Sequence, residues 1–332
     1  MFRNQTMISV IIPVYNVCNY LSQCVESVLA ACSRFCSVYD TGYEILLIDD
    51  GSTDYCSELC DAFAFEHSEV VAIHKQNSGQ GPARNIGLNI STGEYISFVD
   101  SDDMISDSMY CSLMAAMRET ESDVAVCDST KDVAQLYSSN DKKEMLTFFA
   151  DEAVLSCIYD GEIRDVVWDK LYKRNVVNDL LFSSFEIGED VYFLFQALGN
   201  AHKIVKIKKK LYFYRQHDES IMNASFSPKW LGALDAKEAR HGYIVENMPV
   251  IADDSAMVII NTCIYDGQCA YKYLKGKQLY SVIHRLSKTI KKYRLPKRII
   301  SGYGIKRKIW LRMARISLPV TCWLRYKLNV GF

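Results

Sequence analysis

Acidic residues gather directly after two apolar runs of the chain. The run Glu44–Asp49 continues into Asp50-Gly51-Ser52, and the run Tyr95–Val99 continues into Asp100-Ser101-Asp102-Asp103. Carboxylates this close in sequence repel one another strongly unless they share a proton or a cation. Because side chains alternate along an extended segment, Asp100 and Asp102 point the same way and can reach one ligand. Their hard oxygen atoms suit Mg²⁺ or Mn²⁺ holding a diphosphate.

These acidic clusters also have a simpler interpretation. They could form only tight turns and helix caps, with Asp54 capping the helix that follows the first cluster. For the first cluster alone this alternative is the favoured one, and it also remains open for the second. Two clusters at the ends of two predicted strands favour a ligand site instead.

A glycine-containing segment, Asn77–Gly87, lies between the two clusters. Gly79 and Gly81 make its first part flexible, Pro82 opens a helix, and Arg84 falls in the first turn. A cation and unpaired backbone N–H groups are therefore expected near the same strand ends. No Gly-x-Gly-x-x-Gly and no Walker A loop follows the first strand, so a bound nucleotide would need other groups to neutralise its phosphates.

Strand and helix patterns alternate through the first half of the chain. The apolar runs are rich in Ile, Val and Leu without strict alternation, as in strands covered on both faces. They predict a doubly wound, mostly parallel α/β sheet, which binds ligands beyond the C-terminal ends of its strands. Predicted strands cover 9–14, 44–49, 70–73, 95–99 and 124–127, with a strand pair in 202–215; predicted helices cover 20–32, 54–66, 143–158, 189–199 and a segment from 82.

The composition is that of an ordinary globular protein. Its 332 residues are 49% hydrophobic and 23% charged, which excludes a mainly disordered chain. The 12 cysteines include no Cys-x-x-Cys pair and no zinc signature. The apolar run near the N-terminus is expected to be a buried strand rather than a signal peptide, and no run is long enough to span a membrane. A reduced, cytoplasmic protein is therefore expected.

Four ordered segments resemble the family 2 glycosyltransferases, which have the GT-A fold. They are SVIIPVYN, LLIDDGSTD, NSGQGPARNIGL and YISFVDSDD, and the resemblance extends over about residues 8–220. It implies inverting transfer from a nucleotide-diphosphate sugar, usually a UDP-sugar. The implied donor contacts are Pro13 and Tyr15 at the base, Asp50 at the uracil N3–H, Arg84 at the base or ribose, Asp100 at the ribose, and Asp102 at the metal on the diphosphate.

Further segments extend this resemblance into the second half. Trp168 and Lys170 belong to a segment similar to one that lies near the acceptor in the family. Glu189-Asp190 resembles the family's Glu-Asp motif, in which one carboxylate is the general base. We favour Asp190 as the base with Glu189 positioning the acceptor, although acids at this point also suit the start of a helix. In a closing Tyr-Arg-x-His segment, Arg215 would lie near the diphosphate, and His217 is either a metal ligand or diphosphate contact or a structural histidine.

The last 66 residues carry a charge unlike that of the rest. From Gly267 to Phe332 there are 17 Lys and Arg and no Asp or Glu, against 21 basic and 40 acidic residues before it. Ile305, Ile309, Met313, Ile316 and Val320 form an apolar stripe among these cations. That pattern is typical of an interfacial helix on anionic lipid. A solvated or partner-binding face is the alternative, and no nucleic-acid module is recognisable.

Together these observations predict a metal-dependent inverting glycosyltransferase. We expect a nucleotide-sugar half at 1–125, an acceptor half at 126–225, and a basic helical region at 226–332 attached to the inner face of the cell membrane. The expected acceptor is a lipid-linked oligosaccharide for capsule, exopolysaccharide or O-antigen. One alternative is an inactive nucleotide-sugar-binding protein that recruits partners. A sugar-1-phosphate nucleotidyltransferase is disfavoured because PVYN stands where it would need a glycine-rich loop with arginine.

Overall fold

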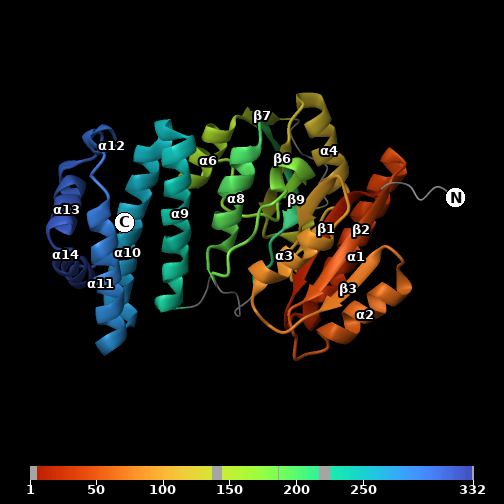
Figure 1. The fold of residues 1–332 in the computed structure, drawn as a ribbon, viewed down its shortest axis with the longest axis horizontal. Coiled ribbons are helices and arrows are strands. Elements are labelled where there is room, and N and C mark those ends of the chain that lie inside the picture. Colours follow the sequence, from red (N-terminus) through yellow and green to blue (C-terminus); the bar gives the residue numbers. More distant parts are fainter. Residues whose placement is uncertain (1–5, 137–143, 186, 217–224, 331–332) are drawn as a thin grey trace. The chain divides into compact units, whose positions relative to one another are not determined.

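The computed structural model describes residues 6–136, 144–185, 187–216 and 225–330, which form two compact units. The first unit comprises the described residues of Met1–Ser184 and Phe193–His217. The second unit comprises those of Phe185–Tyr192 and Asp218–Phe332. Residues 185–192, which the sequence places in the acceptor half, therefore pack with the C-terminal helices. Figure 1 labels the elements of each unit.

The first unit is built on a nine-stranded sheet with the order β3-β2-β1-β4-β8-β6-β9-β5, and β7 also pairs with β9. β1 pairs in parallel with β2 and β4, and β2 with β3, as predicted for the first half of the chain. The strands are β1 (Thr6–Val14), β2 (Gly42–Asp49), β3 (Val70–His74), β4 (Tyr95–Phe98), β5 (Met104–Ile105), β6 (Val124–Thr130), β7 (Met145–Phe148), β8 (Lys170–Lys173) and β9 (Ile204–Phe213).

Helices cover both faces of this sheet, which confirms the predicted doubly wound α/β class (Figure 1). Val10 and Ile12 point into a core shared with α1 (Cys18–Tyr39), α2 (Cys56–Glu66) and α4 (Met109–Thr120). Ile11 points to the opposite face, where α3 (Gln80–Ile90) approaches so closely that a Cβ on Gly87 would lie 2.4 Å from its side chain. The apolar runs of β1 and β2 are continuous because both faces are covered.

The second half of the sheet differs in detail from the prediction. β8 lies antiparallel between β4 and β6, although its sequence was not expected to form a strand. The predicted strand pair in 202–215 is the single strand β9. The predicted helix over 143–158 is also wrong at its start, because the first part of this segment forms β7, which pairs with β9. The helix α6 (Ala150–Ile158) begins later, where the Glu152 carboxylate accepts a hydrogen bond from the Phe149 N–H (2.9 Å). The remaining helices of this half are α5 (Val133–Leu136), α7 (Arg174–Val177) and α8 (Glu189–Asn200).

The described part of the second unit beyond residue 224 is helical, as predicted. Its core lies along α10, which packs on α9, α11, α12 and α14. Gly267 permits the close packing of α14, because a Cβ there would lie 2.5 Å from the Cys322 sulfur. No helix among the described residues is both long and apolar enough to cross a membrane. The elements are η2 (Pro228–Trp230), α9 (Leu231–Asn247), η3 (Pro249–Ile251), α10 (Ala252–Tyr273), α11 (Gly276–Lys292), α12 (Lys297–Ser301), α13 (Ile305–Ile316) and α14 (Leu318–Lys327).

Candidate active site

The parallel strands bring four predicted donor-binding residues to one edge of the sheet. Pro13 is buried at the end of β1, and Tyr15, directly after that strand, is 47% exposed. Asp50 follows β2, and its N–H donates to the Val14 carbonyl (2.8 Å). Asp100 follows β4, which pairs with β1 on the other side. The C-terminal ends of such strands are where doubly wound sheets bind ligands.

The carboxylate of Asp50 holds the glycine-containing loop against this edge. It is buried and accepts from the N–H groups of Ser78 (2.9 Å) and Gly79 (2.7 Å). Lys75 forms an ion pair with it and also donates to the Ser78 hydroxyl (2.6 Å). A carboxylate offers about four acceptor positions, so one remains for a ligand N–H. Sequence reasoning missed Lys75, because no motif marks this lysine as the partner of Asp50.

Gly51 lets this loop come close. Its φ is +72°, a conformation that favours glycine, and an added Cβ would lie 2.9 Å from the Asn77 nitrogen. A side chain at this position would therefore push the loop away from Asp50. The glycine after the paired aspartates has a structural reason that is independent of any ligand.

Asp49 has a structural role that differs from that of Asp50. It accepts hydrogen bonds from His74 Nδ1 (2.9 Å), the Ser57 hydroxyl (2.6 Å) and the Ser52 N–H (3.0 Å). Burial by itself would raise the pKa of Asp49, but these hydrogen bonds together lower it. Asp49 therefore stays ionised and fixes the turn that carries Asp50.

Arg84 lies beneath the second acidic cluster. Its guanidinium is 1% exposed, donates to Asp100 Oδ1 (2.8 Å) and lies 5.2 Å from the centre of the Phe182 ring. Asn85 holds Phe182 in place through hydrogen bonds to its carbonyl (2.9 Å) and from its N–H (2.7 Å). Arg84 is thus positioned to act on a ligand through Asp100, since its own surface is covered.

Asp103 is the buried member of the cluster and ties it to β9. Its carboxylate accepts from the Tyr212 hydroxyl (2.8 Å) and from the Arg215 N–H (2.7 Å). Burial raises the pKa of Asp103 to about 9, and the nearby charges of Asp100 and Asp102 add to this rise. Sequence reasoning gave Asp103 no separate task, because its partners are more than a hundred residues away.

Asp102 is partly exposed, and the side chain of Arg215 is hydrogen-bonded to its main chain. The Arg215 Nε donates to the Asp102 carbonyl (2.7 Å), and another guanidinium nitrogen donates to Gln23 (2.8 Å). Arg215 therefore lies beside the acidic cluster, as the diphosphate prediction requires. His217, the other residue predicted in that segment, lies outside the described residues.

The acidic cluster fits a cation that takes part of its ligands from a diphosphate. Among the described residues, no three His, Cys, Asp or Glu side chains come together as a complete metal site. Asp100 already binds Arg84, and Asp103 already binds Tyr212. Mg²⁺ and similar hard cations use one or two protein carboxylates, with phosphate and water oxygens completing the shell. Asp102 at the partly exposed end of the cluster suits this arrangement.

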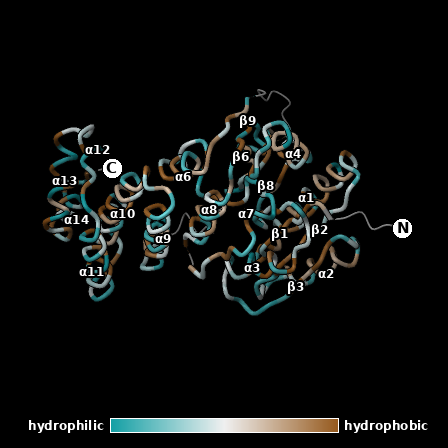
Figure 2. Tube along the Cα trace, turned by 45° about the horizontal axis from the view of Figure 1, so that its top comes forward, coloured by the Kyte–Doolittle hydropathy of each residue, from teal (hydrophilic) through white to brown (hydrophobic). Residues whose placement is uncertain are grey.

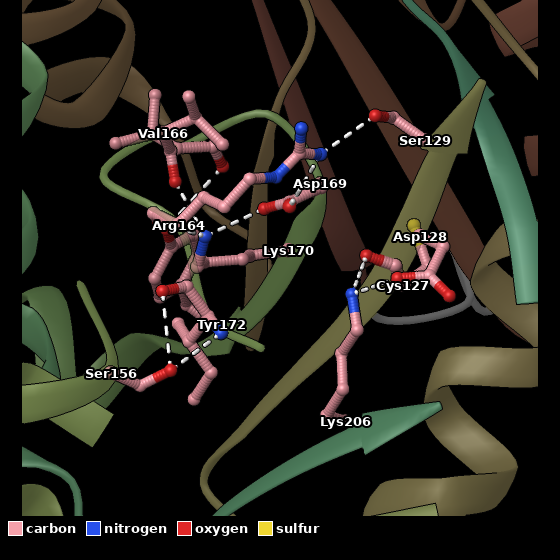
Figure 3. A network of polar contacts seen from close by, with 12 residues as sticks. Cys127, Asp128, Ser129, Ser156, Arg164, Val166, Asp169, Lys170, Tyr172 and Lys206 are labelled. Atoms are coloured by element: carbon pink, nitrogen blue, oxygen red, sulfur yellow. Dashed lines mark hydrogen bonds and ion pairs between the residues drawn. The ribbon is translucent and has the colours of Figure 1, made fainter. Parts of the chain in front are cut away.

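Trp168 and Lys170, predicted near the acceptor, are both buried. The Trp168 ring stacks on Tyr212 with ring centres 4.2 Å apart. Lys170 donates to the carbonyls of Val166 (2.5 Å) and Arg164 (3.2 Å) and pairs with Asp169 (2.6 Å), as Figure 3 shows. These contacts hold the segment before β8. Both positions favour support of the site over direct contact with an acceptor.

Lys206 is a second buried lysine in the same sheet. It donates to the Cys127 carbonyl (2.6 Å) and pairs with Asp128 (2.6 Å) across β6 and β9 (Figure 3). Burial of an ammonium group costs free energy unless such partners satisfy it. The neighbouring Arg164 donates a hydrogen bond to the Ser129 hydroxyl (2.6 Å). Lys206 and Arg164 therefore have structural roles at β6.

Glu189 and Asp190 form the first turn of α8 and are partly exposed. Gly188 precedes them with a φ of +95°, and a Cβ there would lie 2.9 Å from the Ala233 Cα of α9. The start of α8 is thereby fixed within the second unit. The roles of Glu189 and Asp190 in catalysis remain predictions.

Comparison with known proteins identifies the class of this fold and site. The family model for glycosyl transferase family 2 matches residues 9–181. The chain is 31% identical to the glycosyltransferase GlyG of Streptococcus pneumoniae over 242 residues, which is 68% of this chain and 75% of GlyG. The chain therefore belongs to family 2 of the glycosyltransferases and is a glycosyltransferase.

Two further proteins are similar to this chain, one a solved structure and the other a protein named for a biosynthetic process. The crystal structure of S. aureus TarS 1-349 covers 98% of this chain, and this chain covers 93% of it, with a TM-score of 0.72 and 20% sequence identity. That likeness confirms the expected GT-A fold. The minor teichoic acid biosynthesis protein GgaA of Bacillus subtilis is 31% identical over 224 residues, which is 64% of this chain and 48% of GgaA.

Proposed function

We propose that this glycosyltransferase moves a sugar from a UDP-sugar, with inversion, to a hydroxyl of a lipid-linked oligosaccharide in cell-surface polysaccharide synthesis. The observation that carries the proposal is the ion pair of the buried Arg84 with Asp100 at the strand edge where Asp50 also holds the glycine-containing loop, with the partly exposed Asp102 two residues after Asp100. Two similar proteins support it. S. aureus TarS, which shares the fold, has been crystallised with UDP-GlcNAc, and GgaA is named for teichoic acid biosynthesis.

In this proposal the strand-end residues bind the donor. Pro13 and Tyr15 line the base pocket, and the remaining acceptor position of Asp50 takes the uracil N3–H. Arg84 orients Asp100 toward the ribose. Asp102 holds Mg²⁺ or Mn²⁺, which neutralises charge on the diphosphate leaving group when bound.

The acceptor is activated by a carboxylate at the start of α8. Asp190 takes the proton of the acceptor hydroxyl as that oxygen attacks the anomeric carbon, and Glu189 positions the acceptor. Attack from the side opposite the diphosphate inverts the configuration. Arg215 lies by the diphosphate, while Trp168 and Lys170 support the nearby strand, and His217 is a further candidate ligand.

The C-terminal helices attach the enzyme to the anionic inner face of the cell membrane. The predicted stripe does not lie on a single helix, because α13 ends at Ile316 and Val320 lies in α14, after the break at Ser317. α13 packs into the second unit through Leu311 and Ala314 and leaves its stripe residues largely exposed. The stripe residues Ile305, Ile309, Ile316 and Val320 are 76%, 49%, 82% and 52% exposed. Hydrophobic and hydrophilic residues alternate along α13 and α14 in Figure 2. Such a face favours an interfacial position on anionic lipid.

The proposal is tested by UDP release from a panel of UDP-sugars, with Mn²⁺ or EDTA and with membrane extract as the acceptor source. We expect metal-dependent release from one UDP-sugar that rises when extract is added. An inactive nucleotide-sugar-binding protein would instead bind UDP in the presence of metal and release none from any donor. Absence of UDP binding would contradict the assignment of the strand-end site.

A further inference from the structure

A groove of about 530 Å³ opens on the second unit between α11 and the junction of α13 with α14. Its volume is within the usual range for small-molecule sites, about 300–1,000 Å³. One wall is a face of α11, and the other begins at Ile316. The lining residues are Tyr271, Gly276, Leu279, Tyr280, Ile283, His284, Ser287, Lys291, Ile316, Ser317, Leu318 and Pro319.

The lining of this groove is divided into an apolar and a polar part. Leu279 and Ile283 of α11 face the groove together with Leu318 of α14. Tyr280, His284, Ser287 and Lys291 follow one another along α11 at spacings of four, three and four residues, so they share one helix face. A ligand that fits this groove has a hydrocarbon part and a polar end.

The charged residues of the groove lining indicate whether the polar end of the ligand is anionic or cationic. Among the described residues, no acidic side chain lines the groove, and Lys291 is exposed at its rim. The ion pairs between the basic segment and acids of α9 and α10 use Arg285, Lys292 and Arg298. Lys291 takes part in none of these described pairs. The polar end of the ligand is therefore anionic.

The groove is continuous with the exposed apolar stripe. Ile316 belongs both to the groove lining and to the stripe, and its side chain is 82% exposed. Tyr280, at the opposite wall, is 75% exposed. A molecule in the groove can thus have its chain in contact with the same surface that the stripe presents to a membrane.

We propose that this groove binds a single anionic lipid of the membrane. The hydrocarbon chain lies along Leu279, Ile283 and Leu318, and the phosphate lies at Lys291 and His284. A polar peptide or free phosphate would leave the apolar floor unused, and a neutral lipid would leave Lys291 without a counter-charge. The inference deepens the proposed membrane attachment and rests on it.

The test uses short-chain lipids that stay monomeric in water, measured by calorimetry with the whole protein. We expect dihexanoyl phosphatidylglycerol to bind at least tenfold more tightly than dihexanoyl phosphatidylcholine or glycerol 1-phosphate. Equal binding of glycerol 1-phosphate would show a phosphate site without a lipid chain and would overturn the inference. No binding of the phosphatidylglycerol would also overturn it.

Matched variants locate the bound lipid. Lys291→Ala should weaken phosphatidylglycerol binding about tenfold, and Ile316→Ser severalfold. Lys297→Ala and Val250→Ser change exposed residues of the same unit that lie outside both the groove and the apolar stripe, and they should stay within twofold of the parent protein. Equal losses in Lys291→Ala and Lys297→Ala would overturn the site.

These experiments distinguish a failure of the groove inference from a failure of the proposed sugar transfer. Metal-dependent UDP release with no lipid binding in the groove would remove only the groove inference. Lipid binding without UDP release or UDP binding would remove the proposed transfer and leave the groove. Because the four substituted residues are exposed or partly exposed, unfolding is not expected, and thermal melting of each variant verifies this.

Discussion

The acidic strand ends of the first unit and the basic helices of the second unit use charge in opposite ways. Asp50 and Asp100 are each paired with a cation inside the fold, Lys75 and Arg84 respectively, so the geometry of their charges is set before any ligand arrives. In the basic segment, by contrast, most of the 17 Lys and Arg side chains are exposed, as Lys291, Lys306 and Arg312 are. Pre-positioned charge suits recognition of one small molecule, whereas exposed charge suits a broad surface of opposite sign.

The strongest test of the first unit is Asp102→Asn. Loss of the carboxylate that we assign to the metal should lower sugar transfer about a thousandfold, because the leaving diphosphate is no longer neutralised. UDP release with saturating Mn²⁺ measures this loss. Asp107→Asn, which alters only an exposed pair with Arg34, is the matched control and should keep full turnover. Near-normal activity of Asp102→Asn would remove Asp102 from the site.

The next effect concerns the base. Asp190→Asn should lower kcat about a hundredfold with UDP-sugar binding unchanged, since proton removal is lost while the donor site is intact. Glu189→Gln should act mainly on the KM of the acceptor. Steady-state kinetics with both substrates separates the two. If Asp190→Asn keeps its turnover and Glu189→Gln does not, the base is Glu189.

Asp50→Asn tests whether the donor site depends on the loop that Asp50 holds. An amide cannot replace the carboxylate toward Lys75 and two N–H groups, so the loop should loosen and UDP should bind about tenfold more weakly. Faster hydrogen exchange at Ser78 and Gly79 would accompany the change. Unchanged exchange together with weakened UDP binding would instead indicate direct base contact alone.

A pH effect is expected in the second unit at Asp266. Burial raises the pKa of Asp266 from 3.8 to about 7, and Lys237 offsets part of this rise. Between these two values the folded state binds a proton that the unfolded state has released, so stability falls as pH rises through this window. Asp266→Asn removes the free-energy cost of ionising a carboxyl group in this buried position. Its gain in unfolding free energy should exceed ~1 kcal/mol at pH 8 and shrink toward pH 4, as measured by denaturant titration.

The smallest expected effect is that of one surface cation. Arg312→Ala removes an exposed charge of α13, and each such residue near an anionic surface contributes about 1 kcal/mol. Partition onto phosphatidylglycerol vesicles should therefore fall about fivefold in a flotation assay at low salt. Lys131→Ala, an exposed lysine of the first unit, serves as control. Equal losses in both variants would mean that general charge, and not this face, drives binding.

Much of the first unit followed from the sequence because its signals are local. Buried parallel strands require continuous apolar runs, and the turn after β2 requires glycine at 51. The order of the four motifs was enough to identify the family. The same kind of reasoning found the apolar stripe at Ile305, Ile309 and Ile316, because helical spacing and an acid-free segment are both visible along the chain.

Other features were decided only by packing between distant segments. The burial of the Lys170 ammonium group follows from the place of β8 inside the sheet between β4 and β6, and its position near the acceptor stays a prediction. The partnership of Lys75 with Asp50 and that of Tyr212 with Asp103 join residues far apart in sequence. The groove beside Lys291 likewise exists only because α14 returns to α11. Sequence determined which groups are ionisable and where apolar faces lie. Tertiary structure determined which of those groups are buried with partners, which keep their charge, and which remain exposed to a ligand.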